Sequence, residues 1–155
     1  MANENLSDET MVEVLKTVKL WDIFSKAKGL DTVLESQGKN LSGGQAQRVA
    51  LARALLYDAS VYIFDEATSN IDIESEEIIL NIIHSLAKEK TVIYISHRLP
   101  AIKNADCIYV MDKGRVIESG KHNDLYAKKE LYYNMYKHQE ELETYLTKRG
   151  ETNEK

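Results

Sequence analysis

At residues 61–66 the chain reads Val61-Tyr62-Ile63-Phe64-Asp65-Glu66, four apolar residues followed by two acids. A continuous apolar run of this length predicts a short strand that is buried on both faces, as strands of parallel sheets are. The carboxylates of Asp65 and Glu66 then stand at its carboxyl end. Such a pair suits a Mg²⁺–nucleotide site, because one acid can support the metal while the other polarises a water molecule. The alternative is that both acids only cap the following loop, and on these residues alone the two interpretations are equally good.

A second run of the same kind, Thr91-Val92-Ile93-Tyr94-Ile95, predicts another buried strand. His97 follows this strand, separated from it only by Ser96. Ligands of open α/β sheets bind beyond the carboxyl ends of the strands. We therefore expect His97 on the same side of the sheet as Asp65 and Glu66, although a single histidine after a strand is usually only a polar loop residue.

Helical patterns flank both strands. The segment between them carries apolar residues that recur at helical spacing, namely Ile78, Ile79, Ile82, Ile83 and Leu86. Near the amino terminus, Met11, Leu15, Val18 and Trp21 predict one amphipathic helix that starts at Ser7 and ends before Gly29. The segment 30–40 is polar and is expected to be a loop. Alternating strands and helices predict an α/β fold with parallel central strands.

The carboxy-terminal part predicts a hairpin followed by helix. Two strand-like runs, Cys107–Met111 and Arg115–Glu118, flank Asp112-Lys113-Gly114. The segment from about His122 to Leu146 reads as helical. Its tyrosines are expected to pack this helix rather than to stack on a nucleotide base; they are Tyr126, Tyr132, Tyr133 and Tyr136.

The stretch Leu41-Ser42-Gly43-Gly44-Gln45 opens another helical pattern, which runs to Asp58. Ser-x-x-Gln is a capping box that any helix can use. Two consecutive glycines inside it weaken the first helical turn by up to about 1 kcal/mol each. They also let an anion approach the exposed N–H groups and the positive end of the helix dipole, so we expect a phosphate site.

Composition excludes several classes of function. The 155 residues fit one domain or part of one, and a net charge of −5 without basic clusters makes nucleic acid an unexpected partner. Cys107 is the only cysteine, which rules out an intrachain disulfide, and its apolar neighbours predict a buried thiol. No apolar stretch approaches the roughly 20 residues that cross a bilayer, and no signal peptide is apparent, so we expect the chain in the cytoplasm.

These stretches together resemble the ATP-binding-cassette (ABC) ATPase domain. Residues 41–45, with Gln47-Arg48 and Ala52-Arg53-Ala54, are similar to its LSGGQ signature motif. Residues 61–66 resemble the Walker B strand, and residues 67–72 resemble the D-loop, with Asn70 where alanine is usual. Ile95-Ser96-His97-Arg98-Leu99 resembles the switch-histidine loop. The similarity extends from about Leu6 to Glu140, and the part from about Ala105 to His122 is similar to the exporter branch.

The resemblance implies a role for each motif. Two ATPase domains of this family close head to tail over two ATP molecules, so Leu41, Ser42, Gly43, Gly44 and Gln45 would bind an ATP that another domain holds. Asp65 would support Mg²⁺ through water, Glu66 would be the general base, and His97 would contact the γ-phosphate. Ser69 and Asp72 of the D-loop would belong to the ATP site, and Asp72 would couple the two sites across the pair.

The resemblance also implies a partial P-loop NTPase-like fold, made of a helical subdomain and the carboxy-terminal part of the parallel sheet. The expected parts are a helical region (about 6–57), a sheet core (58–122) and carboxy-terminal helices (123–155). No Gly-x-x-x-x-Gly-Lys-Ser/Thr string, which wraps the phosphates of a nucleotide, occurs in the sequence. The resemblance implies that the P-loop strand lies between the strands matching 91–95 and 107–111, so we expect a gap at the centre of the sheet, with strand edges left bare.

Three functions follow as hypotheses. The first is the ATP-hydrolysing subunit of an exporter, truncated here and inactive by itself, which would act with a second ATPase domain and a membrane domain at the cytoplasmic face of the membrane. The second is a partial subunit that donates its signature motif to the ATP of a partner. The third, a soluble ABC ATPase without a transport role, fits the exporter-like stretch less well.

Overall fold

Two parallel strands form the sheet of the first part of the chain. β1 (Val61–Asp65) pairs with β2 (Thr91–Ile95) in a register that places Asp65 opposite Ile95. The computed structural model describes residues 6–151 and divides into two units between Ile95 and Ser96. The predicted parallel pairing is therefore confirmed within the first unit. The three-part subdivision expected from the sequence stays a prediction.

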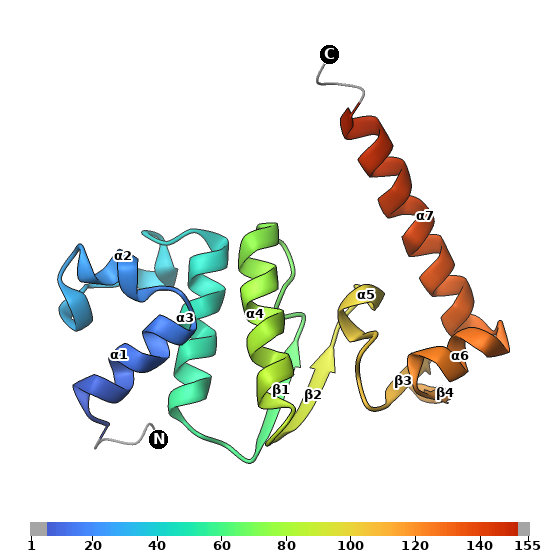
Figure 1. Cartoon of the computed structure of the whole chain (residues 1–155), viewed down its shortest axis with the longest axis horizontal. Coiled ribbons are helices and arrows are strands. Elements are labelled where there is room, and N and C mark those ends of the chain that lie inside the picture. Colours follow the sequence, from blue (N-terminus) through green and yellow to red (C-terminus); the bar gives the residue numbers. More distant parts are fainter. Residues whose placement is uncertain (1–5, 152–155) are drawn as a thin grey trace. The chain divides into compact units, whose positions relative to one another are not determined.

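The helices of the first unit share one hydrophobic core with this sheet, and the first two of them pack on other helices rather than on the strands (Figure 1). The helices are α1 (Asp8–Thr17), α2 (Trp21–Ser25), α3 (Gly43–Leu56) and α4 (Ile73–Leu86), with two short 3-10 turns at Gly29–Asp31 and Ser36–Gly38. Helices α3 and α4 lie side by side. The core is lined by Val18, Leu20, Phe24, Leu51, Ala52, Tyr62, Phe64, Ile79 and Ile83.

The expectation that both strands are buried on two faces is wrong. Tyr62 and Phe64 face the helices, whereas Val61 and Ile63 are 51% and 66% exposed. Strand β2 alternates in the same way, with Ile93 and Ile95 about half exposed at 48% and 49%. The core of this unit lies on a single face of the sheet, so the alternate residues, although apolar, remain in contact with solvent.

The prediction of one continuous helix from Ser7 to before Gly29 is also wrong, because the helix ends and the chain turns at Lys19. This residue has a φ of 56°, in the left-handed region that commonly ends a helix. Val18 and Leu20, on either side, are both 0% exposed. The turn directs two apolar side chains into the core, which a continuous helix would not do.

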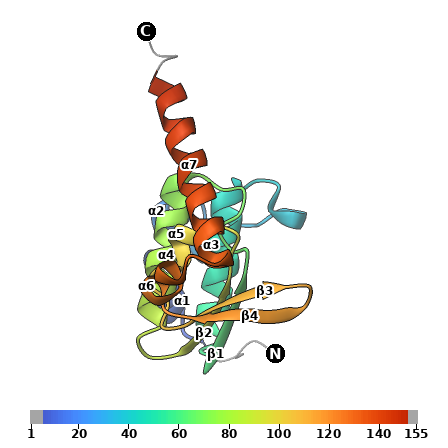
Figure 2. The same cartoon turned by 90° about the vertical axis from the view of Figure 1, so that its right-hand side faces the viewer.

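The second unit contains the predicted hairpin. β3 (Ile108–Asp112) and β4 (Arg115–Gly120) pair antiparallel, as Figure 2 shows, with a register shift between Val110 and Met111. Lys113 and Gly114 both have positive φ, 47° and 74°, which is the backbone of a tight hairpin turn. These two strands form a sheet of their own, and the place of a P-loop strand between residues 91–95 and 107–111 stays a prediction.

The remaining elements of this unit are helices. α5 (Leu99–Ile102) precedes the hairpin, and the helical segment after it is two helices rather than one: α6 (His122–Lys128) and α7 (Leu131–Glu151). They separate at Lys129, whose φ is 56°. The core of the unit is formed by Leu99, Ile108, Val110, Leu125 and Tyr132. No helix within residues 6–151 is both long and apolar enough to cross a membrane.

The tyrosines pack these helices, as predicted. Tyr126, Tyr133 and Tyr136 form ring contacts with one another or with His122, and the Tyr132 hydroxyl lies 2.9 Å from His122 Nδ1. Burial raises the pKa of Tyr132 to about 12.

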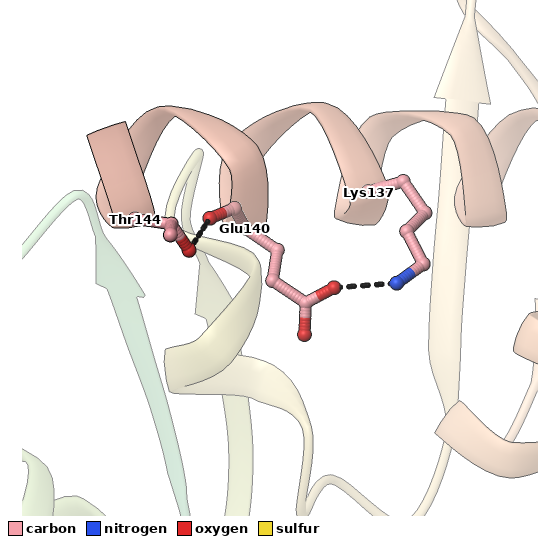
Figure 3. A network of polar contacts seen from close by, with 3 residues as sticks. All are labelled: Lys137, Glu140 and Thr144. Atoms are coloured by element: carbon pink, nitrogen blue, oxygen red, sulfur yellow. Dashed lines mark hydrogen bonds and ion pairs between the residues drawn. The ribbon is translucent and has the colours of Figure 1, made fainter.

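Further along α7 the exposed surface carries apolar side chains, such as Leu142 and Tyr145, beside polar pairs. Lys137 Nζ lies 2.7 Å from Glu140 Oε2, and the Thr144 hydroxyl donates to the Glu140 carbonyl (Figure 3).

The prediction for Cys107 is wrong: its side chain is exposed. It lies just before β3, where burial alternates, with Ile108 and Val110 buried and Tyr109 exposed.

Candidate functional site

The amino-terminal end of α3, which we call the glycine tip (residues 41–45), is an exposed helix start with a complete capping box. The Ser42 hydroxyl accepts a hydrogen bond from the Gln45 amide at 3.2 Å, and the Gln45 side chain accepts one from the Ser42 amide at 3.0 Å. These two bonds do not involve the first two amides of the helix, which are those of Gly43 and Gly44. Neither donates a hydrogen bond to any group in the described part of the chain. Free amides at the positive end of a 14-residue helix favour an anion.

The two glycines of the tip have different surroundings. A Cβ added at Gly43 would meet only ordinary contacts, the nearest being the Asn70 carbonyl at 3.7 Å. A Cβ added at Gly44 would lie 2.5 Å from Ser75 Cβ and 2.6 Å from Asp72 Oδ2, and closer still to the Ser75 hydroxyl. Gly44 is buried and lets α3 approach the start of α4, so a packing role accounts for this glycine. Exposed Gly43 keeps the access that an anion needs.

The acidic loop (residues 65–72) runs from the end of β1 to α4 and passes beside the glycine tip. Asp72 caps α4 by accepting a hydrogen bond from the Ser75 amide at 2.8 Å. This bond, followed by one from the Ser75 hydroxyl, lowers the pKa of Asp72, and the positive charge of Arg48 adds a smaller effect. Asp72 is therefore a fixed carboxylate whose hydrogen bonds hold the end of the loop.

Glu66 occupies a constrained turn at the start of the acidic loop. Its φ is 48°, a left-handed conformation that costs a residue with a side chain on the order of 1 kcal/mol. The Glu66 amide donates to the Ile95 carbonyl at 3.0 Å, and the Glu66 carbonyl accepts from the Ser69 amide at 3.0 Å. Buried Thr68 lies 2.9 Å from the Tyr94 hydroxyl. The position of Glu66 is thus set by neighbouring backbone and by strand β2.

Asp65 and Glu66 are exposed and offer the carboxylate oxygens that Mg²⁺ prefers. No group of three or more potential ligands gathers within residues 6–151, so these residues do not form a closed metal cage. Mg²⁺ in nucleotide sites is held by one or two carboxylates together with phosphates and water. The residues present fit that kind of site.

The structure brings the glycine tip close to residues 70–72 of the acidic loop. Asp65, Glu66 and Ser69 belong to the same unit. His97 belongs to the second unit, where it is exposed. The Ser96 hydroxyl accepts a hydrogen bond from the Arg98 amide at 2.9 Å, and this bond closes the turn around His97.

Sequence reasoning did not anticipate two positions of this site. Arg48 forms hydrogen bonds with three backbone carbonyls, although only its place in a motif drew attention to it. The spacing of four between Gly44 and Arg48 puts them on one helix face and was an available signal. Ser75 carries no sequence signal, because its closeness to Gly44 depends on how α3 and α4 pack.

Asn70 departs from the alanine usual in the motif, and its backbone shows why asparagine suits this chain. Its φ is 56°, a region where asparagine is favoured over other residues with side chains. We expect Asn70→Ala to lower the free energy of unfolding by about 1 kcal/mol, whereas Asn70→Gly should leave it unchanged or higher. Urea denaturation of the three proteins measures this, and equal stability of the alanine and asparagine forms would contradict it.

Comparisons with known proteins agree with these features. A family model described as ABC transporter matches residues 1–69. The chain is 52% identical over 143 residues to an uncharacterized ABC transporter ATP-binding protein of Haemophilus influenzae, covering 92% of this chain and 26% of that protein. It is 46% identical to an alpha-hemolysin translocation ATP-binding protein of Escherichia coli, covering 86% of this chain and 19% of that protein.

A solved structure is also similar. The structure of a bacterial Atm1-family ABC exporter with ATP bound matches with a TM-score of 0.82 and 36% identity, over 89% of this chain and 24% of that chain. The α/β fold and its family resemblance are therefore confirmed. The chain spans about a quarter or less of the length of these relatives.

Proposed function

Because the chain belongs to the ABC transporter family of ATP-binding proteins, we propose that it forms part of a composite ATP site, in which its glycine tip binds the γ-phosphate of an ATP held by another domain. The free amides of exposed Gly43 and of the adjoining, buried Gly44 carry this proposal. Exposure matters because a phosphate site open to water binds weakly and must be covered by a partner to become effective. A P-loop, which is not in these 155 residues, would grip the remaining phosphates.

The acidic loop would serve the hydrolytic step. Bound Mg²⁺–ATP supplies the phosphoryl group that passes to water. Glu66 would accept the proton of the attacking water, and Asp65 would support the metal through a water ligand. His97 would contact the γ-phosphate. Ser69 and Asp72 would belong to the ATP site, and Asp72, which lies beside Gly44 of the tip, would couple the two sites of a head-to-tail pair.

We extend the proposal to an assembly in which this chain works with a second ATPase domain and a membrane domain at the cytoplasmic face of a membrane. The names of the relatives support a role in transport. Besides the hemolysin translocation protein, they include an ATP-dependent lipid A-core flippase of Francisella tularensis, 44% identical over 135 residues. Energy from ATP hydrolysis would then drive export of a substrate.

A chimera tests the proposal. In it, this chain replaces the 143 matching residues of the Haemophilus influenzae relative, so that an ATP-binding protein is complete. Ser42→Arg places a long cationic side chain at the exposed tip, where it fills the space that a γ-phosphate would enter. We expect the ATPase rate of the chimera to fall at least about 100-fold, in line with removal of a positioned phosphate contact.

The control for this experiment is Ser85→Arg, which makes the same change at an exposed position near the other end of α4. Its rate should stay within about twofold of the unsubstituted chimera, as for a surface substitution. An unchanged rate with Ser42→Arg would refute the role of the tip. Hydrolysis of ATP by the purified 155-residue chain alone would refute the division of the site between domains.

A further inference from the structure

Arg48 lies one helical turn after Gly44 on α3 and forms hydrogen bonds both with this glycine and with the turn between α1 and α2. Its Nε donates a hydrogen bond to the Gly44 carbonyl at 3.3 Å. Its Nη1 donates to two further carbonyls, those of Val18 at 3.4 Å and Lys19 at 3.1 Å. One guanidinium therefore connects the first turn of α3 with the turn between α1 and α2.

The carbonyls that Arg48 contacts in that turn are natural partners for a cation. Val18 is the C-cap of α1, and Lys19 has the left-handed conformation that ends this helix. The last carbonyls of a helix lack partners within the helix and carry the negative end of its dipole. A guanidinium, with five donors in a rigid plane, can satisfy several of them at once.

Gly44 is consequently fixed on two sides. Its Cα faces Ser75 and Asp72 at the start of α4, and its carbonyl is held by Arg48. Because Gly44 and Gly43 provide the free amides of the tip, the direction of these donors depends on both contacts.

We propose that Arg48 is a positioning residue, which orients the phosphate-binding amides of the glycine tip by anchoring Gly44 to the carbonyls of Val18 and Lys19. Arg48 does not touch the phosphate in this arrangement and acts through Gly44. Its effect on hydrolysis rests on the proposed function, whereas its effect on the tip can be measured in the chain without any nucleotide.

The first measurement uses the unsubstituted 155-residue chain labelled with ¹⁵N. We expect the Nε–H proton of Arg48 to exchange with solvent more slowly than that of Arg53, which is exposed on the same helix. Equal exchange of the two Nε–H protons would overturn the proposal, and no variant needs to fold for this result.

The second measurement compares Arg48→Lys with the matched control Arg53→Lys. Lysine keeps the charge but not the planar set of donors. Arg48→Lys should therefore shift the amide resonances of Gly43, Gly44 and Gln45, while Arg53→Lys leaves them in place. Unmoved tip resonances in Arg48→Lys would overturn the proposal.

The third measurement uses the chimera at saturating ATP. Arg48→Lys should lower kcat about 10-fold or more without changing the Kd for ATP, because misplacing a group by about 1 Å can reduce a rate 100-fold while the nucleotide is gripped elsewhere. If Arg48 were only structural, its loss would lower the fraction of active protein and the free energy of unfolding. Active-site titration of Arg48→Gln gives the fraction of active protein. The kcat per active site then shows whether the remaining active protein is also slower. An unchanged kcat per active site would overturn the catalytic part of the proposal. If Ser42→Arg also leaves the rate unchanged, the proposed function fails while the NMR result for Arg48 stands.

Discussion

Gly44→Ala is expected to lower the free energy of unfolding of the chain by about 1–3 kcal/mol, the usual range for overpacking a filled interior. The added methyl group would sit 2.5 Å from Ser75 Cβ and 2.6 Å from Asp72 Oδ2, so α3 and α4 would have to separate. Contacts on two sides limit the movement, because Ser75 and Asp72 pack against the Gly44 Cα and the Arg48 side chain anchors the Gly44 carbonyl. Urea denaturation of the 155-residue chain gives the difference directly.

Gly43→Ala is the matched control, one residue away on the same helix. Its methyl group would meet nothing closer than 3.7 Å, and alanine is favoured over glycine in a helix by up to about 1 kcal/mol. This variant should be as stable as the unsubstituted chain or more stable. Ser75→Gly combined with Gly44→Ala should recover part of the lost stability, since it removes the atoms closest to the new methyl group. Equal stability of the two alanine variants would show that α3 and α4 are not packed as described.

The order of strands and helices was predictable because it depends on local signals. The run Val61–Phe64, the alternation with helical segments and the Ser42–Gln45 capping box each follow from residues close together in the chain, and the structure confirms them. The break at Lys19 was not predictable in this way. Met11, Leu15, Val18 and Trp21 fit one helical face, and only the core that receives Val18 and Leu20 favours the turn.

Burial was predicted less well than secondary structure because it depends on what covers each face. An apolar run such as Thr91–Ile95 looks the same whether helices cover one face of the strand or both. Within the first unit they cover one, and Ile93 and Ile95 are exposed. The same reason explains Cys107, whose apolar neighbours belong to β3 while the thiol lies just before it.

The residues of the candidate site were predictable from the sequence, but the tertiary contacts that hold them in place were less so. The residues of the glycine tip and the acidic loop were identified from their motifs, and the structure places these two segments together. The contacts that hold them join positions far apart in sequence, such as Arg48 with Val18 and Thr68 with Tyr94. Contacts of this kind arise only from tertiary packing.

Glu66→Gln should have the largest effect on catalysis. If Glu66 is the general base, the substitution removes the group that accepts a proton from water, and such groups contribute about 10²–10⁴-fold to a rate. Glutamine has nearly the same shape, and the turn is held by the Glu66 amide bond to the Ile95 carbonyl, which does not involve the side chain. We therefore expect kcat of the chimera to fall by about 10²–10⁴-fold, while the Kd for ATP and the free energy of unfolding stay close to their original values.

The matched control for this change is Glu77→Gln, because Glu77 is exposed on α4 and also loses one carboxylate. A rate within about twofold of the unsubstituted chimera is expected for such a surface position. Single-turnover hydrolysis and equilibrium ATP binding, measured on the same preparations, separate a loss of chemistry from a loss of binding. If Glu66→Gln weakened ATP binding as strongly as it slowed hydrolysis, Glu66 would act in holding the nucleotide. If it changed neither, the proton would have to be taken by another group, and the role assigned to the acidic loop would be wrong.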